Sequence, residues 1–275
     1  MQNIKAYIML VCATLFWAGN FMVGKYAFLE NIPPMSLVFF RWLLVWLILL
    51  PFTYKEIIKN KDIILNNLPL LFFLAFTSVG LFNTFTYLSL TYTQVINASL
   101  FNTAIPAAII FLCFLFKIEK TNKFQIFGLV LSLFGILSII TKLDLNVLLS
   151  LNFNKGDLIM IGGVITWGLY SAFLKKKNFT LPLLTLVQVL CTLGLIFVFP
   201  QFLYELSQGL TVKFDMKLGY TLIYLALFPS IGSYYCWAGA VAIIGANRAG
   251  IFLSLIPFFS TIMAIIFFNE QFKFF

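Results

Sequence analysis

Charge is scarce in this chain. Only 10% of its 275 residues are Asp, Glu, Lys or Arg, and histidine is absent. Water-soluble domains carry about 25% charged residues, because a surface facing water needs them. Together with 62% hydrophobic residues and a mean hydropathy of +1.02, this excludes an ordinary soluble domain. The absence of histidine excludes imidazole as a base, a metal ligand or a proton relay.

Cysteine is also rare, and its positions exclude most of its chemistry. All four cysteines lie inside apolar runs without Cys-X-X-Cys spacing: Cys12, Cys113, Cys191 and Cys236. This pattern predicts small buried hydrophobic residues, with no disulfide and no metal site. The chain has no paired-Asp motif and no serine beside a mid-span acid, so we expect neither a cofactor nor an enzyme. A membrane-embedded transferase, which would need such groups, is the least favoured alternative.

Long apolar runs make up most of the chain. A membrane-spanning helix needs roughly 20 mainly apolar residues. Division at charge clusters and at Pro, Asn and Gly predicts nine spans, at 6–24, 33–52, 66–88, 95–116, 124–141, 158–174, 182–204, 218–238 and 246–268. The predicted fold class is therefore all-α, a polytopic membrane helical bundle.

The formal net charge of +9 comes from lysines between the spans, not from a continuous basic stripe. This distribution excludes nucleic acid as a partner and fits loops facing anionic lipid. With the N-terminus inside, ten lysines face the cytoplasm (Lys5, Lys55, Lys59, Lys61, Lys117, Lys120, Lys123, Lys175, Lys176, Lys177) and six face outward (Lys25, Lys142, Lys155, Lys213, Lys217, Lys273). We therefore predict a multi-pass protein of the inner (plasma) membrane with a cytoplasmic N-terminus.

The sequence repeats itself at a nearly constant offset. An offset of 150 pairs Trp17 with Trp167 and Lys25 with Lys175, and an offset of 151 pairs Ala98 with Ala249, Pro106 with Pro257 and Glu119 with Glu270. We predict a first repeat of five helices at 1–142, a connecting loop at 143–157 and a second repeat of four helices at 158–275. Because five is odd, the second repeat enters the membrane inverted, which is typical of transporters.

The second repeat has no counterpart of residues 125–142, since residue 275 corresponds to residue 124. Two explanations remain: a natural set of nine spans, or a chain shortened at its C-terminus. We expect the second, because a missing helix would leave a normally packed face uncovered. A shortened chain leaves open a non-transporting pseudo-transporter or a structural subunit as the alternative function.

Three stretches carry a resemblance to a known family. They are Leu15 to Phe21 (LFWAGNF), Phe40-Arg41-Trp42, and the Ala98, Pro106, Glu119 pattern with its second-half copy. Together they resemble the EamA family of the drug/metabolite transporter superfamily, over nearly the whole chain. The resemblance implies ten helices in an inverted five-plus-five arrangement. It also implies transport, often export, of amino acids, their derivatives, nucleosides, vitamins and other small metabolites. The chain departs from this pattern by lacking the tenth helix.

We therefore expect a transporter of a small organic metabolite, an amino acid or a derivative, that exports by alternating access around a central cavity. Its expected partners are the small-molecule substrate and membrane lipid. Polar and aromatic residues within the spans are the cavity candidates: Trp17, Asn20, Asn83, Tyr87, Asn97, Asn102, Trp167, Tyr170, Tyr234 and Trp237. Polar side chains within spans usually face the bundle interior. For Asn20 the alternative to substrate binding is a hydrogen bond between helices. For Asn83, Tyr87, Asn97, Asn102 and their second-half counterparts it is ordinary divergence between the two repeats.

Three further residues have two interpretations each. Pro106 and Pro257 predict matched hinges, or helix curvature that membranes tolerate. Arg41, within the second span, predicts contact with a substrate anion, or a side chain that reaches a lipid headgroup.

The nine acidic residues all fall in loops or at predicted helix ends. Proton-coupled carriers commonly use a titratable group inside the membrane. The sequence therefore predicts facilitated diffusion or exchange instead of proton coupling.

Overall fold

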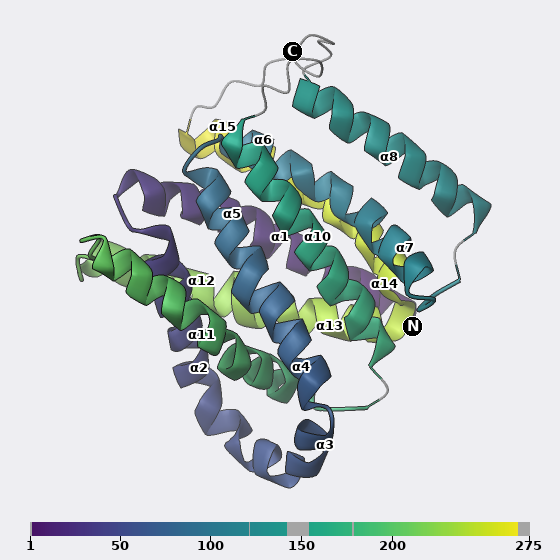
Figure 1. Cartoon of the computed structure of the whole chain (residues 1–275), viewed down its shortest axis with the longest axis horizontal. Helices are drawn as coiled ribbons and strands as arrows, with labels where there is room; N and C mark the ends of the chain where they lie inside the picture. Colours follow the sequence, from purple (N-terminus) through teal and green to yellow (C-terminus); the bar gives the residue numbers. More distant parts are fainter. Residues whose placement is uncertain (1, 121, 142–153, 178, 269–275) are drawn as a thin grey trace.

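The structure is a computed structural model that describes residues 2–120, 122–141, 154–177 and 179–268 (Figure 1). Within those residues every regular element is a helix. The elements are α1 (Gln2–Leu29), α2 (Pro34–Lys59), α3 (Lys61–Asn66), α4 (Leu68–Ala75), the π-helix η1 (Phe76–Phe82), α5 (Asn83–Leu90), α6 (Val95–Leu100), the 3-10 helix η2 (Phe101–Ala104), α7 (Ile105–Leu115), α8 (Lys123–Thr141), α10 (Lys155–Lys176), α11 (Leu183–Ser207), α12 (Met216–Leu225), the π-helix η3 (Ala226–Gly232), α13 (Ser233–Ile244), α14 (Ala246–Gly250), the 3-10 helix η4 (Ile251–Ser254) and α15 (Leu255–Phe268).

Eight helices among the described residues are long and apolar enough to cross a membrane. They coincide with eight of the nine predicted spans, and the predicted polytopic helical fold is confirmed. Several are composite, since α4, η1 and α5 form one span and α12, η3 and α13 another. The remaining predicted span, 124–141, coincides with α8, which is not one of these eight helices. The count of nine spans therefore stays a prediction.

The irregular turns recur at one offset in the two halves. The π-helices begin at Phe76 and Ala226, and the 3-10 helices begin at Phe101 and Ile251, which is 150 residues in both cases. The sequence pairs Ala98 with Ala249 and Pro106 with Pro257 at an offset of 151, one residue more than the offset of these element starts. The structural counterparts of Asn83 and Tyr87 are Ser233 and Trp237.

The two halves run in opposite directions. Near the end of α1, Lys25 Nζ donates to Leu90 O (3.4 Å) and to Thr93 O (3.1 Å). At the start of α10, Asn154 Nδ2 donates to Tyr92 O (3.4 Å). The end of one first helix and the start of the other thus meet the same turn, so the equivalent helices α1 and α10 are antiparallel.

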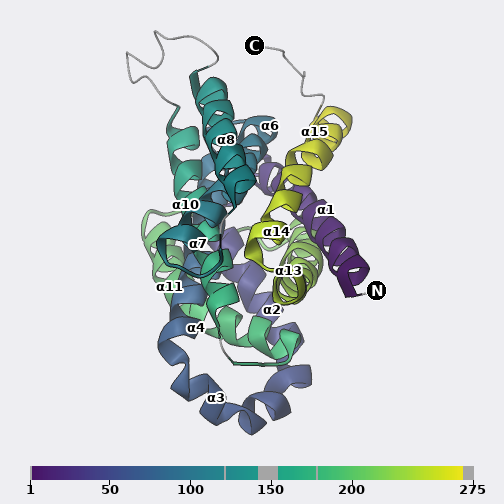
Figure 2. The same cartoon turned by 90° about the vertical axis from the view of Figure 1, so that its right-hand side faces the viewer.

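The halves are interlocked. Helix α1 packs against α13 and α15 of the second half, α10 packs against α5 and α7 of the first, and α2 packs along α11. Figure 2 shows α1 with α13, α14 and α15 on one side of the molecule, and α7, α8 and α10 on the other. A cavity at the centre of this bundle is therefore lined by both halves.

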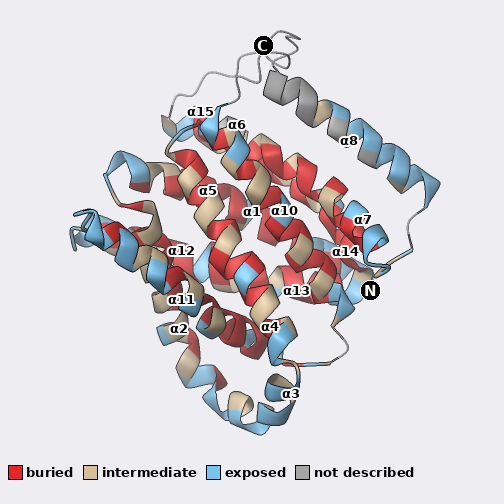
Figure 3. Ribbon diagram, in the orientation of Figure 1, coloured by how far each residue is buried: buried red, intermediate tan, exposed pale blue. Residues whose placement is uncertain are grey.

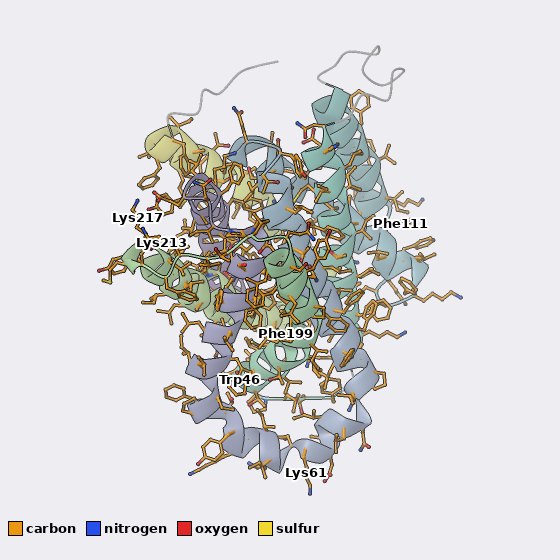
Figure 4. The ribbon with its side chains drawn as sticks, turned by 60° about the vertical axis from the view of Figure 1, so that its left-hand side comes forward. Trp46, Lys61, Phe111, Phe199, Lys213 and Lys217 are labelled. Atoms are coloured by element: carbon orange, nitrogen blue, oxygen red, sulfur yellow. The ribbon has the colours of Figure 1, made fainter. Side chains whose placement is uncertain are left out.

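Buried residues concentrate in these central helices, whereas α3 and the described part of α8 are mostly exposed (Figure 3). The exposed sides of the spans are apolar and aromatic. Figure 4 shows Phe111, which is 51% exposed, pointing out from the side of the bundle, while Lys61 lies at one end. An apolar circumference with charges at the ends is the surface expected of a protein surrounded by lipid.

Candidate substrate site

Arg41 lies at the centre of a buried hydrogen-bond network between four elements. Its side chain, on α2, is 1% exposed. Its terminal nitrogen donates to Asn20 Oδ1 on α1 (3.0 Å), and to Asn83 Oδ1 (2.9 Å) and Tyr87 OH (2.7 Å) on α5. Arg41 Nε donates to Ser230 Oγ on η3 (2.6 Å). This burial contradicts the interpretation that Arg41 reaches a lipid headgroup.

The partners of Arg41 are themselves fixed. Tyr87 OH donates to Asn20 Oδ1 (2.7 Å). The π-helices supply two more contacts, because Asn83 Nδ2 donates to Ser78 O (2.9 Å) and Ser230 Oγ donates to Leu225 O (2.7 Å). Both pairs are five residues apart, which is the spacing of a π-turn, and such turns are frequent at functional sites.

Every hydrogen-bond partner of Arg41 is neutral. The ion pairs Lys59–Glu56 and Lys217–Glu30 both lie near helix ends, away from Arg41. The guanidinium also lies 5.2 Å from the centre of the Trp42 ring and 5.8 Å from that of Tyr87, within cation–π range. Amide and hydroxyl dipoles and ring faces solvate the charge, but no described carboxylate neutralises it.

An aromatic cluster from both halves lies beside this network. The Trp17 ring is edge-on to Trp167 at 5.0 Å and to Trp237 at 5.6 Å, and Tyr170 and Tyr234 pack against Trp167 at 4.9 and 5.5 Å. Trp17 Nε1 donates to Pro229 O (3.1 Å). In contrast, Trp167 Nε1, Trp237 Nε1 and Tyr170 OH are buried without a partner. Buried polar groups are normally paired, so unused donors here point to a ligand.

A cavity lies between the network and the cluster. It is lined by Trp17, Asn20, Phe21, Phe82, Asn102, Ile105, Trp167, Leu253 and Ile256. Its volume is about 10 Å³, roughly the room that one water needs. Asn102 is 1% exposed; its Nδ2 donates to Ser99 O (3.1 Å), and its Oδ1 is buried without a partner. The cavity is thus narrow and has few polar groups.

The structure brings nearly all the predicted residues together. Trp17, Asn20, Asn102 and Trp167 line the cavity, Asn83 and Tyr87 bind Arg41, and Tyr170, Tyr234 and Trp237 belong to the aromatic cluster. Asn97 lies in α6, but its side chain is outside the described residues. That these residues bind substrate stays a prediction.

The two prolines occupy similar breaks in the fourth spans. Pro106 is the second residue of α7, directly after η2, and Pro257 is the third residue of α15, after η4. Proline is tolerated in a first helical turn because the missing N–H would be unpaired there. The prolines therefore follow short 3-10 segments, and their role as hinges stays a prediction.

Sequence reasoning missed Ser230, Phe82 and the apolar lining residues. A serine and a phenylalanine in apolar spans carry no distinctive signal by themselves. Only the Pro229-Ser230 pair, which interrupts an apolar run, indicated a local irregularity in the seventh span of the structure.

The described residues form eight apolar helices in two antiparallel halves around a cavity with aromatic, apolar and a few polar walls. This arrangement defines a multi-pass membrane protein of the transporter class. Residues 4–141 match the EamA-like transporter family, and residues 154–275 match it again. The chain therefore belongs to the EamA-like transporter family.

Similar proteins bear this out. An uncharacterized transporter of Archaeoglobus fulgidus is 30% identical over 279 residues, which cover 100% of this chain and 93% of the relative. The uncharacterized transporter YyaM of Bacillus subtilis is 26% identical over 96% of this chain and 86% of its own length. YetK of the same organism, also an uncharacterized transporter, is 26% identical over 99% and 82%.

Proposed function

We propose that this protein exports a small organic metabolite, an amino acid or a derivative, by alternating access around the central cavity that Trp17, Asn20 and Trp167 line. The observation that carries the proposal is the cavity itself, because both halves line it and two of its buried polar groups, Trp167 Nε1 and Asn102 Oδ1, lack partners. Two inverted halves can exchange conformations and so open one site to either side in turn. The proposed location is the plasma membrane, with a cytoplasmic N-terminus.

Two carboxylates that bridge the halves support this mechanism. Glu119 of the first half accepts hydrogen bonds from Ala246 N (3.0 Å) and Asn247 N (3.2 Å), where the eighth span begins. Glu205 of the second half accepts from Met35 N (3.0 Å), Ser36 N (2.6 Å) and Ser36 Oγ (2.7 Å), at the start of α2. A carboxylate at a helix N-terminus satisfies free N–H groups and the positive end of the helix dipole.

The two contacts lie at opposite ends of the bundle. Ser36 comes after one span, so the chain has crossed the bundle once before it. Glu119 comes after four spans, so the chain has crossed the bundle four times before it. An odd and an even number of crossings leave these residues at opposite ends. Each contact holds the halves together at one end, while the cavity lies between them. We therefore propose that they act as two gates, and that transport requires each to open in turn.

Neutralising one gate should open the cavity to that side alone. Removing a charge at a helix N-terminus weakens the contact by roughly 1 kcal/mol, a factor of about five in population. The measurement is the labelling rate of Ile105→Cys, in a variant without native cysteines, by an impermeant thiol reagent added to either face of oriented vesicles. Glu119→Gln should increase labelling from the Glu119 face, and Glu205→Gln from the other. Equal increases from both faces would contradict the gating proposal.

The transport activity itself is tested with purified protein in liposomes. Saturable uptake of amino acids or their derivatives, absent from empty liposomes, is the expected result. Because every described acid lies near a helix end or in a loop, we expect exchange or facilitated diffusion. Uptake that follows an imposed pH gradient with fixed stoichiometry would show that the proposed lack of proton coupling is wrong. Intracellular accumulation of a metabolite in a deletion strain tests the export direction.

A further inference from the structure

The orientation of Asn20 determines what the cavity presents to a solute. Asn20 Oδ1 accepts hydrogen bonds from both Arg41 (3.0 Å) and Tyr87 (2.7 Å). A carboxamide oxygen has two lone pairs, so both are used. The amide nitrogen of Asn20, which carries two N–H donors, is therefore left for the cavity that this residue lines.

The polar groups that line the cavity are of two kinds, hydrogen-bond donors and a hydrogen-bond acceptor. Asn20 supplies N–H donors backed directly by the unneutralised charge of Arg41, and a buried charge in a low dielectric acts strongly over short distances. Trp167, whose indole N–H has no partner, also lines the space. On another wall, Asn102 supplies an acceptor, because its Nδ2 is bonded to Ser99 O and its Oδ1 has no partner.

The remaining walls are apolar: Phe21, Phe82, Ile105, Leu253 and Ile256. Since both halves contribute to them, an apolar group in this space would contact each half. The cavity in this closed state has room for about one water, so a solute enters only when the halves separate. A solute that uses all these lining groups would then combine an anionic group, a separate hydrogen-bond donor and an apolar part.

We propose that Asn20, backed by Arg41, is the specificity-determining residue for a carboxylate on the solute, and that Asn102 accepts a hydrogen bond from an amino or hydroxyl group of the same solute. The carboxylate takes the Asn20 N–H groups and supplies the counter-charge that Arg41 lacks among the described residues. The solute class is 2-amino or 2-hydroxy acids with an apolar side chain. This inference rests on the proposed transport function and names what that site recognises.

The sharpest test is Asn20→Asp. Aspartate keeps the shape of asparagine and still accepts from Arg41 and Tyr87, so the network that holds α1, α2 and α5 together is retained. It removes the N–H donors of Asn20 and places a carboxylate beside Arg41, which neutralises the charge of Arg41. Binding is measured on the purified full chain in detergent with alanine, leucine and phenylalanine, their 2-hydroxy analogues and their methyl esters. We expect the wild-type protein to bind at least one acid and to prefer it to its ester, and Asn20→Asp to weaken that binding tenfold to a hundredfold, on the order of one charge-assisted hydrogen bond.

Asn102→Asp makes the same chemical change at another lining residue, but it also replaces the donor to Ser99 O by an oxygen, so its melting temperature is measured beside its binding. It should retain or strengthen binding of the ammonium-bearing acid and weaken binding of the 2-hydroxy analogue. Wild-type protein that binds a methyl ester as tightly as its acid, or none of the acids, would overturn the inference. So would an Asn20→Asp protein that elutes as wild type on size exclusion, melts at the same temperature and binds the acids unchanged.

The inference and the proposed function fail separately. Acid-selective binding without flux in liposomes would leave the recognition site standing and contradict transport. Saturable flux of a metabolite that lacks an acidic group, with no binding of the acids, would support transport and overturn the recognition site.

Discussion

Gly194→Ala is expected to destabilise the protein strongly, although it adds only one methyl group. A Cβ atom at position 194, on α11, would lie 2.5 Å from Val79 Cβ on the π-helix η1 and would also overlap Val79 Cγ1. Valine is branched at Cβ and stiff at χ1, so it has no alternative rotamer that moves its Cβ away. The helices would have to separate, and overpacking of this kind costs about 1–3 kcal/mol. The measurement is the melting temperature of the purified protein in detergent.

Two further variants show whether this contact is the cause. Gly219→Ala, on α12, places its methyl group where no atom lies within 4 Å, so it should keep or raise the melting temperature, since alanine favours helix by about 1 kcal/mol over glycine. Val79→Gly combined with Gly194→Ala removes the clashing Cβ atom as well as the branch; it should recover part of the lost stability, since glycine in a helix costs about 1 kcal/mol. Equal losses in Gly194→Ala and Gly219→Ala would show that the close approach of Gly194 to Val79 is not the cause.

The Gly194 contact also matters for the site. Val79 is one residue after Ser78, whose carbonyl accepts from Asn83, and Asn83 binds Arg41. In membranes, close approach at small residues replaces much of the hydrophobic driving force between helices. The approach of α11 to η1 therefore sets the position of the wide turn on which the network depends.

The sequence predicted the spans well because the membrane imposes one rule on all of them. A span must be long, apolar and internally hydrogen-bonded, and each condition is visible in a window of residues. The repeat was visible for a similar reason, because Trp17 and Trp167 are rare residues at a constant offset. The prediction that polar residues within spans face inward also placed Asn20 and Asn102 correctly in the interior.

The arrangement around Arg41 was less predictable, because it depends on where wide turns form. A π-turn changes which residues share a helix face, and nothing in Phe76 to Phe82 (FTSVGLF) distinguishes it from an ordinary helix. Nor does the sequence show that Ser230, 189 residues after Arg41, completes the network. The gate carboxylates were equally hidden, since Glu205 near the end of a span indicates a loop-facing acid and not a buried contact to another helix.

The two halves carry different residues at the site. At the offset of 150 shared by the π-helices, Arg41 corresponds to Cys191, Asn20 to Tyr170 and Asn102 to Phe252. The surrounding scaffold keeps its symmetry, with Trp17 opposite Trp167 and η1 opposite η3. A symmetric scaffold suits a structure that must open both ways, whereas an asymmetric solute needs unlike groups on the two sides. Divergence at these positions is therefore what a carrier of such a solute requires.

Arg41→Met should nearly abolish transport while leaving the protein folded. Losing the charge removes the positive field behind Asn20, and transport should fall at least about tenfold, by the loss of a charge-assisted contact. Stability should change little, because replacing a buried charge by an apolar side chain of similar length removes its desolvation penalty. The neighbours keep bonds of their own, since Tyr87 donates to Asn20 and Ser230 to Leu225 O.

Arg41→Lys separates charge from geometry in the same position. The guanidinium donates from one nitrogen to Ser230 and from another to Asn20, Asn83 and Tyr87, and a lysine ammonium is a single point that cannot reproduce that fork. We expect Arg41→Lys to retain part of the transport that Arg41→Met loses, with a weaker apparent affinity for substrate. Flux in liposomes and melting temperature, measured on the same preparations, decide the matter. If Arg41→Met transports within twofold of wild type, Arg41 has no part in transport; if its melting temperature collapses together with flux, the network serves the fold instead of the solute.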